Sequence, residues 1–306
     1  MIAFVLRRMA ASVVTLLLLS VTIFLLVRAT GDPARVYAGA EASEEEVAAV
    51  REDFGLDRPL PVQYASFVTD TVKGDLGHSI QFRQPVFEVY MDRLPRSLIL
   101  ATVAFGLSLV IGIPAGVLSA VRPGRWSAGV FRAVALTGVS VPNFVIATTL
   151  ILVFAVKLRW LPTSGSGSIK QLVMPSIALG WYFAAAMMRL TQSSMLEVMR
   201  GEYVKLARLK GVPEWIVIGK HALKNALIPV LTLAGVNFVV MVNVAVVIEQ
   251  IFAWPGIGDL VYQGITLRDF PLVQGVVLMA GFMVVAVNLI VDVVYAVLDP
   301  RIRLER

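Results

Sequence analysis

The chain alternates between long apolar runs and shorter polar segments. Six of the runs are about 19–25 residues long. A helix rises 1.5 Å per residue, so runs of this length match the ~30 Å hydrocarbon core of a bilayer. The pattern therefore predicts six membrane-spanning helices, at Met9–Arg28, Ser97–Val121, Arg132–Val156, Leu172–Leu190, Ala226–Glu249 and Val273–Val297.

The polar segments divide the chain into three parts and indicate an all-α polytopic membrane protein. Residues 1–30 form the first span. Residues 31–96 are too long for a linker, and their acidic run Glu44–Glu46 suits the first turn of a helix. We expect a small helical insertion there, outside the cytoplasm. Residues 97–306 form a five-helix core that carries a polar loop at 191–225.

Charge follows the spans. The chain is 58% hydrophobic and only 16% charged, which excludes an ordinary soluble domain. Residues 189–224 hold seven basic and three acidic residues, whereas residues 31–96 hold seven basic and twelve acidic residues. Short basic loops stay in the cytoplasm, so the polar loop and both termini are predicted to be cytoplasmic. The net charge of +6 therefore reflects topology and does not indicate nucleic-acid binding. The N-terminal run is interpreted as a retained span.

The polar loop from Gly201 to Pro229 has the pattern of two short helices. In the first, polar residues recur every three positions and apolar residues fill the other side: Glu202, Lys205 and Arg208 against Tyr203, Leu206 and Ala207. Gly211 is placed where a residue after the helix takes positive φ, and Pro213 suits the start of the second helix. An apolar face left in water favours a docking role over a simple connector.

Catalytic chemistry finds little support. The chain has no Cys, no glycine-rich phosphate loop and no HExxH motif. Its two histidines, His78 and His221, fall on opposite sides of the predicted membrane. We therefore expect no catalytic residue, no metal site and no ATP hydrolysis by this chain.

Polar residues inside the spans are the candidates for a transport pathway. Asn237, Asn243 and Glu249 lie on the fifth run. The asparagines suit either interhelical hydrogen bonds or a pathway. Glu249, at the outer end, could face a pathway or the water boundary. Gly112 and Gly116 on the second run predict close helix packing.

Several ordered motifs resemble the inner-membrane permease subunits of ABC importers, in the dipeptide, oligopeptide, nickel and glutathione branch. The loop sequence EYVKLARLKG followed by HALKNALIPV resembles the cytoplasmic-loop motif of these permeases. The other matching segments, in chain order, are RRMAASVVTLLLLSVTIFLLVRATGDPA, GDLGHSI, LRWLPTSG, EQIFAWPGIGDL and VDVVYAVLDPRIR. Thr30 and Leu209 depart from the usual family residues, and Leu209 could alter the fit to a partner.

The resemblance implies the type I importer permease fold in a bacterial inner membrane. It implies four partners besides membrane lipid: a second homologous permease, two cytoplasmic ATPase subunits that bind ATP and Mg, and an extracytoplasmic substrate-binding protein. Glu202, Tyr203, Ala207, Arg208 and Gly211 would then couple the chain to an ATPase. Short peptides are the expected cargo, with glutathione, nickel chelates and other small solutes as alternatives. An ATP-independent channel or secondary transporter would instead predict paired charges or interrupted helices at the midplane, and neither is clear.

Overall fold

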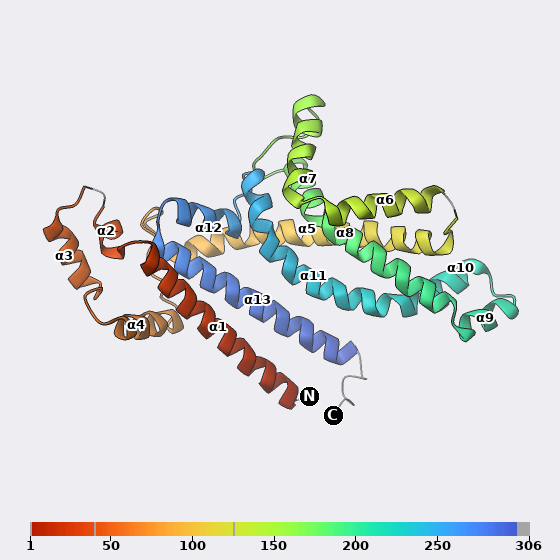
Figure 1. Cartoon of the computed structure of the whole chain (residues 1–306), viewed down its shortest axis with the longest axis horizontal. Coiled ribbons are helices and arrows are strands. Elements are labelled where there is room, and N and C mark those ends of the chain that lie inside the picture. Colours follow the sequence, from red (N-terminus) through yellow and green to blue (C-terminus); the bar gives the residue numbers. More distant parts are fainter. Residues whose placement is uncertain (1, 40, 125, 299–306) are drawn as a thin grey trace. The chain divides into compact units, whose positions relative to one another are not determined.

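A computed structural model describes residues 2–39, 41–124 and 126–298 (Figure 1). Every regular element within these ranges is a helix, apart from an isolated β-bridge between His78 and Pro85, which confirms the all-α class. The elements are α1 (Ile2–Thr30), α2 (Pro33–Ala38), α3 (Glu44–Asp53), α4 (Leu60–Val72), α5 (Val86–Val121), α6 (Trp126–Ser140), α7 (Asn143–Leu150), η1 (Ile151–Lys157), α8 (Ile169–Met199), α9 (Glu202–Leu209), α10 (Glu214–Ile216), η2 (Val217–Leu223), α11 (Lys224–Ile251), α12 (Ile257–Thr266) and α13 (Phe270–Leu298); η1 and η2 are π-helical.

Five helical segments among the described residues are long and apolar enough to cross a membrane, and a bent pair would be a sixth if it forms one span. The bent pair, Gly129–Ser140 with Asn143–Lys157, corresponds to the third predicted span, and its two arms meet at 111°. Pro142 explains the break. Proline has no N–H to continue the helix, and it disfavours helical backbone at the residue before it.

The chain forms two compact units. The first combines Met1–Pro95 with Gly256–Arg306, and the second is Arg96–Pro255. This division differs from the predicted 97–306 core, because the last span, α13, belongs to the first unit and runs beside α1 (Figure 1). Helix α5 begins eleven residues before the predicted apolar run. Its residues up to Pro95 belong to the first unit, and its later residues belong to the second.

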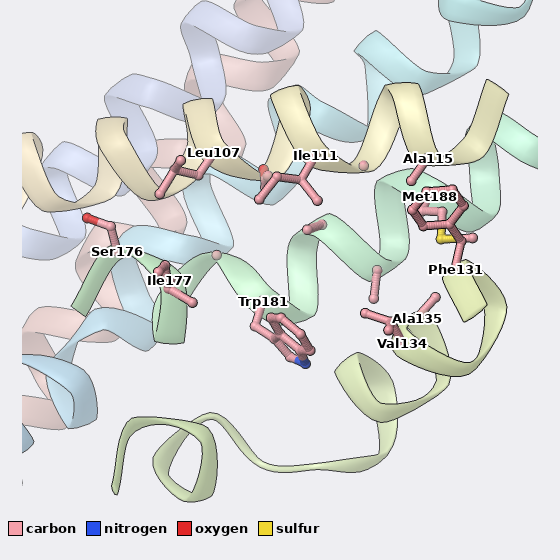
Figure 2. A pocket seen from close by; sticks show the side chains of 15 residues that line it. Leu107, Ile111, Ala115, Phe131, Val134, Ala135, Ser176, Ile177, Trp181 and Met188 are labelled. Carbon is pink, nitrogen blue, oxygen red and sulfur yellow. The ribbon is translucent and has the colours of Figure 1, made fainter. Parts of the chain in front are cut away.

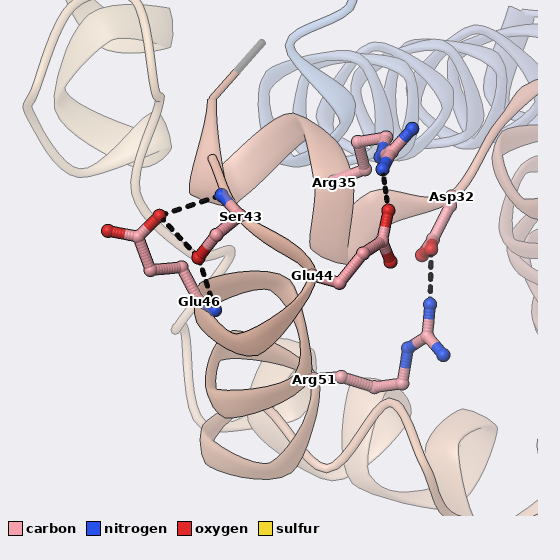
Figure 3. Close-up of polar contacts among 6 residues, drawn as sticks. All are labelled: Asp32, Arg35, Ser43, Glu44, Glu46 and Arg51. Carbon is pink, nitrogen blue, oxygen red and sulfur yellow. Dashed lines mark hydrogen bonds and ion pairs between the residues drawn. The ribbon is translucent and has the colours of Figure 1, made fainter. Parts of the chain in front are cut away.

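The insertion expected at 31–96 is helical and held by caps and ion pairs (Figure 3). Ser43 accepts a hydrogen bond from the Glu46 backbone, and the Glu46 carboxylate accepts one from the Ser43 backbone. Donation to the carboxylate from the Ser43 backbone, and from the Ser43 hydroxyl, lowers the pKa of Glu46. Such a reciprocal cap fixes where α3 begins. The acidic side chains of the first turn interact favourably with the positive end of the helix dipole, as the sequence predicts.

Two arginines connect α2 to α3. Arg35 pairs with Glu44, and Arg51 pairs with Asp32, whose other carboxylate oxygen caps α2 (Figure 3). Because all four side chains are largely exposed, each pair contributes little stability alone. Together they set the register of the two short helices.

Helix α4 packs along the C-terminal half of α1. The Ser20 and Tyr64 hydroxyls are hydrogen-bonded at 2.8 Å. Phe24 is 2% exposed and lies 5.3 Å from the Tyr64 ring and 5.6 Å from the Phe67 ring, measured between centroids. These contacts begin at Ser20, nearly three turns before α1 ends, so the insertion does not stand free of the first span.

Asp269 joins the loop before α5 to the start of α13. Its Oδ2 accepts hydrogen bonds from the Ser79 hydroxyl at 2.6 Å and from the Gln81 backbone N–H at 3.0 Å. Its Oδ1 accepts the Leu272 N–H at 3.1 Å, which caps α13. Asp269 is only 1% exposed, so these three donors compensate for burying the carboxylate. The GDLGHSI motif, which contains Ser79, thus helps to hold the first unit together.

In the second unit, α5, α6 and α8 pack through glycines. A Cβ on Gly112 would lie 2.6 Å from the Ala184 carbonyl oxygen, and one on Gly180 would lie 2.7 Å from that of Ala104. A Cβ on Gly138 of α6 would lie 2.5 Å from the Ala185 Cβ. The close packing predicted from Gly112 and Gly116 is therefore confirmed, with α8 as the helix they pack against.

The core of the second unit lies among α5, α7, α8 and α11. Its buried side chains are Leu100, Ala104, Ala147, Met174, Ala178, Leu179, Phe183, Met241, Ala245, Ile248, Phe252 and Trp254. This core fixes α8 against α11, the two helices that lead into and out of the polar loop (Figure 1).

Candidate functional site

The loop between α8 and α11 has a small apolar interior. Val204 and Ala207 of α9 pack against Val198, Val212 and Val217, and Val204 and Val217 are fully buried. The structure therefore places Ala207 inside the loop, at 7% exposure, and not on the face shared by Tyr203 and Leu206. The inward side of α9 consists of positions 204 and 207, which are three residues apart and follow one stripe of the helix.

Gly211 ends the first loop helix as the sequence predicts. Its φ is +73°, in the left-handed region, and its N–H donates to the Arg208 carbonyl at 2.9 Å. The Val212 N–H donates to the Ala207 carbonyl at 3.2 Å. A Cβ at Gly211 would meet nothing within 4 Å, so the backbone conformation, and not lack of space, favours glycine.

Ion pairs hold the charged side of the loop. Arg208 donates to both carboxylate oxygens of Glu214, at 2.7 and 3.2 Å, and so connects α9 to α10. The hydrogen bond raises the pKa of Arg208. Lys205 pairs with Glu202 at 2.8 Å within α9. Glu202 is thus exposed and locally paired, whereas Arg208 bridges two helices with a bidentate geometry that restricts their angle.

Tyr203 connects the loop to α11. Its hydroxyl accepts a hydrogen bond from Asn225 Nδ2 at 3.2 Å, and Asn225 also donates to the His221 carbonyl at 2.9 Å. Asn225 was not predicted as a site residue, because only the folded loop shows that it reaches back to a residue 22 positions earlier.

The tip of the loop exposes large apolar side chains. Leu209 is 84% exposed, Trp215 76%, Leu206 52% and Tyr203 46%; we call these four residues the loop-tip surface. Sequence reasoning gave Leu209 a possible effect on the fit to a partner but gave Trp215 no contact role, although a large apolar residue among charges is a signal of one. Apolar side chains gathered on a water-facing loop indicate a protein contact.

The base of the loop is held by α5, α8 and α11, together with η2, which continues into α11. Ala120 of α5, Met195 of α8, Ala222 of η2 and Ala226 of α11 form one buried cluster. Val198 packs against both this cluster and the loop interior. A displacement of α9 would therefore be transmitted to the ends of α5, α8 and α11 through close-packed contacts.

Glu249 lies deep in the second unit. It is 1% exposed, and Ser97 donates to its Oε1 at 2.6 Å. The Trp254 backbone N–H donates a hydrogen bond to the Glu249 carbonyl at 2.8 Å, and the Trp254 indole Nε1–H donates one to the Arg96 carbonyl at 3.0 Å. Glu249 is thus not at a water boundary within this chain. The contacts connect the C-terminal end of α11 to the part of α5 that follows Pro95.

Of the two candidate asparagines of α11, the structure describes the side chain of one, Asn237. Asn237 is half-buried, and its Nδ2 finds no hydrogen-bond acceptor among the described residues. An acceptor outside this chain would satisfy it. Asn243 lies within α11, but its side chain falls outside the described part of the structure.

An apolar cavity of about 260 Å³ lies among α5, α6 and α8 (Figure 2). Leu107, Ile111, Phe131 and Met188 line it, and all its described lining residues are uncharged. Such a lining suits an acyl chain or an apolar side chain, and its polar groups include the buried Ser176 hydroxyl and Trp181 indole N–H, which have no hydrogen-bond partner among the described residues.

Comparison with known proteins identifies the family. Residues 112–304 match the binding-protein-dependent transport system inner membrane component, and residues 1–101 match the N-terminal part of the same membrane component. The glutathione transport system permease protein GsiC of Salmonella choleraesuis (strain SC-B67) is 39% identical over 304 residues, which is 99% of each chain. GsiC of Escherichia coli (strain K12) is 38% identical over the same share.

Solved structures show the same fold. An inward-facing structure of the MetNI methionine ABC transporter covers 70% of this chain and 97% of its own, with a TM-score of 0.57 and 19% identity. A chain of an amino acid ABC transporter covers 68% and 94%, with a TM-score of 0.54 and 14% identity. Members of this family assemble with ATPase subunits and a binding protein. The chain therefore belongs to the binding-protein-dependent transport system inner membrane components, and it is a permease subunit of an ABC importer.

Proposed function

We propose that this chain forms half of the translocation pathway for short peptides, with glutathione among them. The observation that carries the proposal is 38–39% identity over 99% of the chain to glutathione permeases. Glutathione is itself a tripeptide, so the expected peptide cargo and the cargo named for these relatives share one chemistry. The other half of the pathway would be a second homologous permease. Two ATPase subunits would bind ATP and Mg, and none of that chemistry would reside in this chain.

Uptake by the assembled importer tests the cargo. Proteoliposomes containing this chain, its second permease and the ATPases should accumulate labelled glutathione or a labelled dipeptide when ATP is supplied on one side and the binding protein on the other. Uptake should cease when either is left out. Accumulation of a nickel chelate, with no peptide or glutathione uptake, would contradict the peptide proposal and leave the permease assignment in place.

The proposed coupling surface is the loop-tip surface together with α9. ATPase closure would push on this surface, and the cluster at the base of the loop would carry the movement into α8 and α11. The exposed Leu209 and Trp215 would supply apolar contacts, while Glu202 and Arg208 would border them with charge.

Gly211→Val tests the coupling. Valine in the left-handed region costs roughly 1–2 kcal/mol, so α9 should be displaced or frayed while the spans remain inserted. We expect substrate-stimulated ATP hydrolysis to fall about 5–30-fold, with unchanged complex yield. Gly219→Val is the matched control, because Gly219 lacks positive φ and also has open space around its Cβ. Equal, near-normal hydrolysis in both variants would contradict the coupling role.

The proposed pathway residues are Asn237, Asn243 and Glu249 of α11. This helix continues directly from the loop, so a movement of α9 reaches it first. The unsatisfied Asn237 Nδ2 supports the proposal, since cargo or the second permease could supply its acceptor. Glu249 would act from a buried position, as the outer end of the pathway opens.

Glu249→Gln isolates the role of the charge. Glutamine retains an oxygen that can accept from Ser97, so the local fold should survive. We expect uptake to fall about tenfold, corresponding to roughly 1.4 kcal/mol on the transport barrier, with basal ATP hydrolysis retained. Ser97→Ala removes the hydrogen bond and keeps the carboxylate, so it separates a structural effect from one of charge. Normal uptake by Glu249→Gln would remove Glu249 from the pathway.

The proposed orientation places both termini and the loop in the cytoplasm and the 31–96 insertion outside. The chain has no Cys, so single-cysteine variants report directly. Glu45→Cys should react with a membrane-impermeant thiol reagent on spheroplasts, and Lys205→Cys only after permeabilisation, since both positions are exposed. The opposite pattern of labelling would invert the topology.

A further inference from the structure

A second cavity, of about 660 Å³, lies entirely within the first unit. Six segments surround it: the end of α1, α2, the loop between α3 and α4, α4, the loop before α5, and the start of α13. We call it the insertion cavity. Its volume falls within the roughly 300–1,000 Å³ of small-molecule sites.

Aromatic and apolar side chains form much of its wall. Tyr37 stacks on Phe54, with ring centroids 4.6 Å apart, and Phe67 and Phe270 contribute further rings. Burial, together with the charge of Asp269, raises the pKa of Tyr37 to about 12. The phenol therefore stays neutral near pH 7 and remains available as a hydrogen-bond donor.

Some polar groups of the cavity are engaged in holding its shape. Arg28 donates to Gln63 Oε1 through two nitrogens, at 2.9 and 3.1 Å, and its guanidinium lies 3.4 Å from the centre of the Phe24 ring. Asp75 Oδ1 accepts the Gly77 N–H at 2.8 Å. These contacts make the cavity a preformed structure.

Other polar groups of the cavity have no hydrogen-bond or ion-pair partner among the described residues. Arg58, Arg83 and Asp70 form no side-chain hydrogen bond or ion pair within the described chain, and all three are exposed. Gln274 Nε2 is buried and finds no acceptor among the described residues. The cavity thus offers two cations, one carboxylate and a buried amide donor, next to an apolar wall.

The backbone at Arg83 supports a role for its side chain. Its φ of +53° lies in the left-handed region, where a residue other than glycine is disfavoured. The conformation is held by the Arg83 N–H, which donates to the Ser79 carbonyl at 3.0 Å, while Ser79 is fixed by Asp269. Strain maintained by a buried network is typical of positions that serve a ligand.

We propose that the insertion cavity binds a small zwitterion with an apolar body, namely a short peptide or an apolar amino acid. Arg58 and Arg83 would bind its carboxylate, Asp70 its ammonium group, and Gln274 a carbonyl oxygen. A simple anion would meet the repulsion of Asp70 and Asp75, and a simple cation that of the arginines. The site is separate from the pathway residues of α11 and does not depend on which cargo the importer carries.

Calorimetric titration of the full chain tests this assignment. The chain is placed in nanodiscs of phosphatidylglycerol, whose head group has no ammonium. Alanyl-phenylalanine should bind saturably. N-acetyl-alanyl-phenylalanine, which is only anionic, and alanyl-phenylalanine amide, which is only cationic, should each bind about tenfold more weakly or worse. Adding phosphatidylethanolamine tests the other source of a zwitterion, and loss of peptide binding on its addition would assign the site to a lipid head group and overturn the peptide assignment.

Matched variants locate the binding. Asp70→Asn, Gln274→Leu and Arg83→Asn should each weaken binding about tenfold; asparagine is chosen at Arg83 because it tolerates the left-handed region. Lys73→Gln and Glu45→Gln change the same charges at exposed positions outside the cavity and should bind normally. The assignment is overturned if the dipeptide shows no saturable binding, if the singly charged probes bind equally well, or if the cavity variants match the controls. Uptake by the importer is measured separately, so failure here leaves the proposed cargo untouched.

Discussion

Close approach of helix backbones is the constraint on which the second unit depends. Between helices in lipid there is no hydrophobic drive of the kind found in water, so association depends on packing and on small residues that let backbones meet. Gly112 on α5 and Gly180 on α8 supply this reciprocally, each next to a carbonyl of the other helix. Any side chain at these sites would force the helices apart, and the buried cluster at the base of the loop would open with them. The loop therefore rests on a rigid three-helix support.

Rigidity of that support gives the loop a mechanical role. A soft connector would absorb a push, whereas α9 is joined on several sides: through Val204 to the loop interior, through Arg208 to Glu214, and through Tyr203 to Asn225. The charged pair among these contacts is weak alone, because it is exposed and screened. Their different directions restrict α9 to moving together with its neighbours, and close packing transmits such displacements.

The sequence predicted what local pattern determines. Apolar runs gave the spans, the acidic run gave the start of α3, and the spacing around Gly211 gave its positive φ, since each depends on residues a few positions apart. The bend at Pro142 could not be inferred from proline alone, because Pro175 and Pro229 lie inside α8 and α11 without ending those helices. Pairing of α13 with α1 could not be inferred, because helices in lipid are uniformly apolar and their patterns do not identify partners.

Long-range polar contacts account for the rest of what sequence reasoning missed. Glu249 meets Ser97 across 152 positions, and Asp269 meets Ser79 across 190. In each case the carboxylate lies at the edge of an apolar run in the sequence, but the structure buries it and places a serine Oγ 2.6 Å from a carboxylate oxygen. A buried carboxylate is tolerated only with such donors, so each must be matched by a residue whose position the fold alone decides. That requirement makes Ser79 a positioning residue: by fixing the loop that carries Arg83, the Asp269 network sets the wall of the insertion cavity as well as the start of α13.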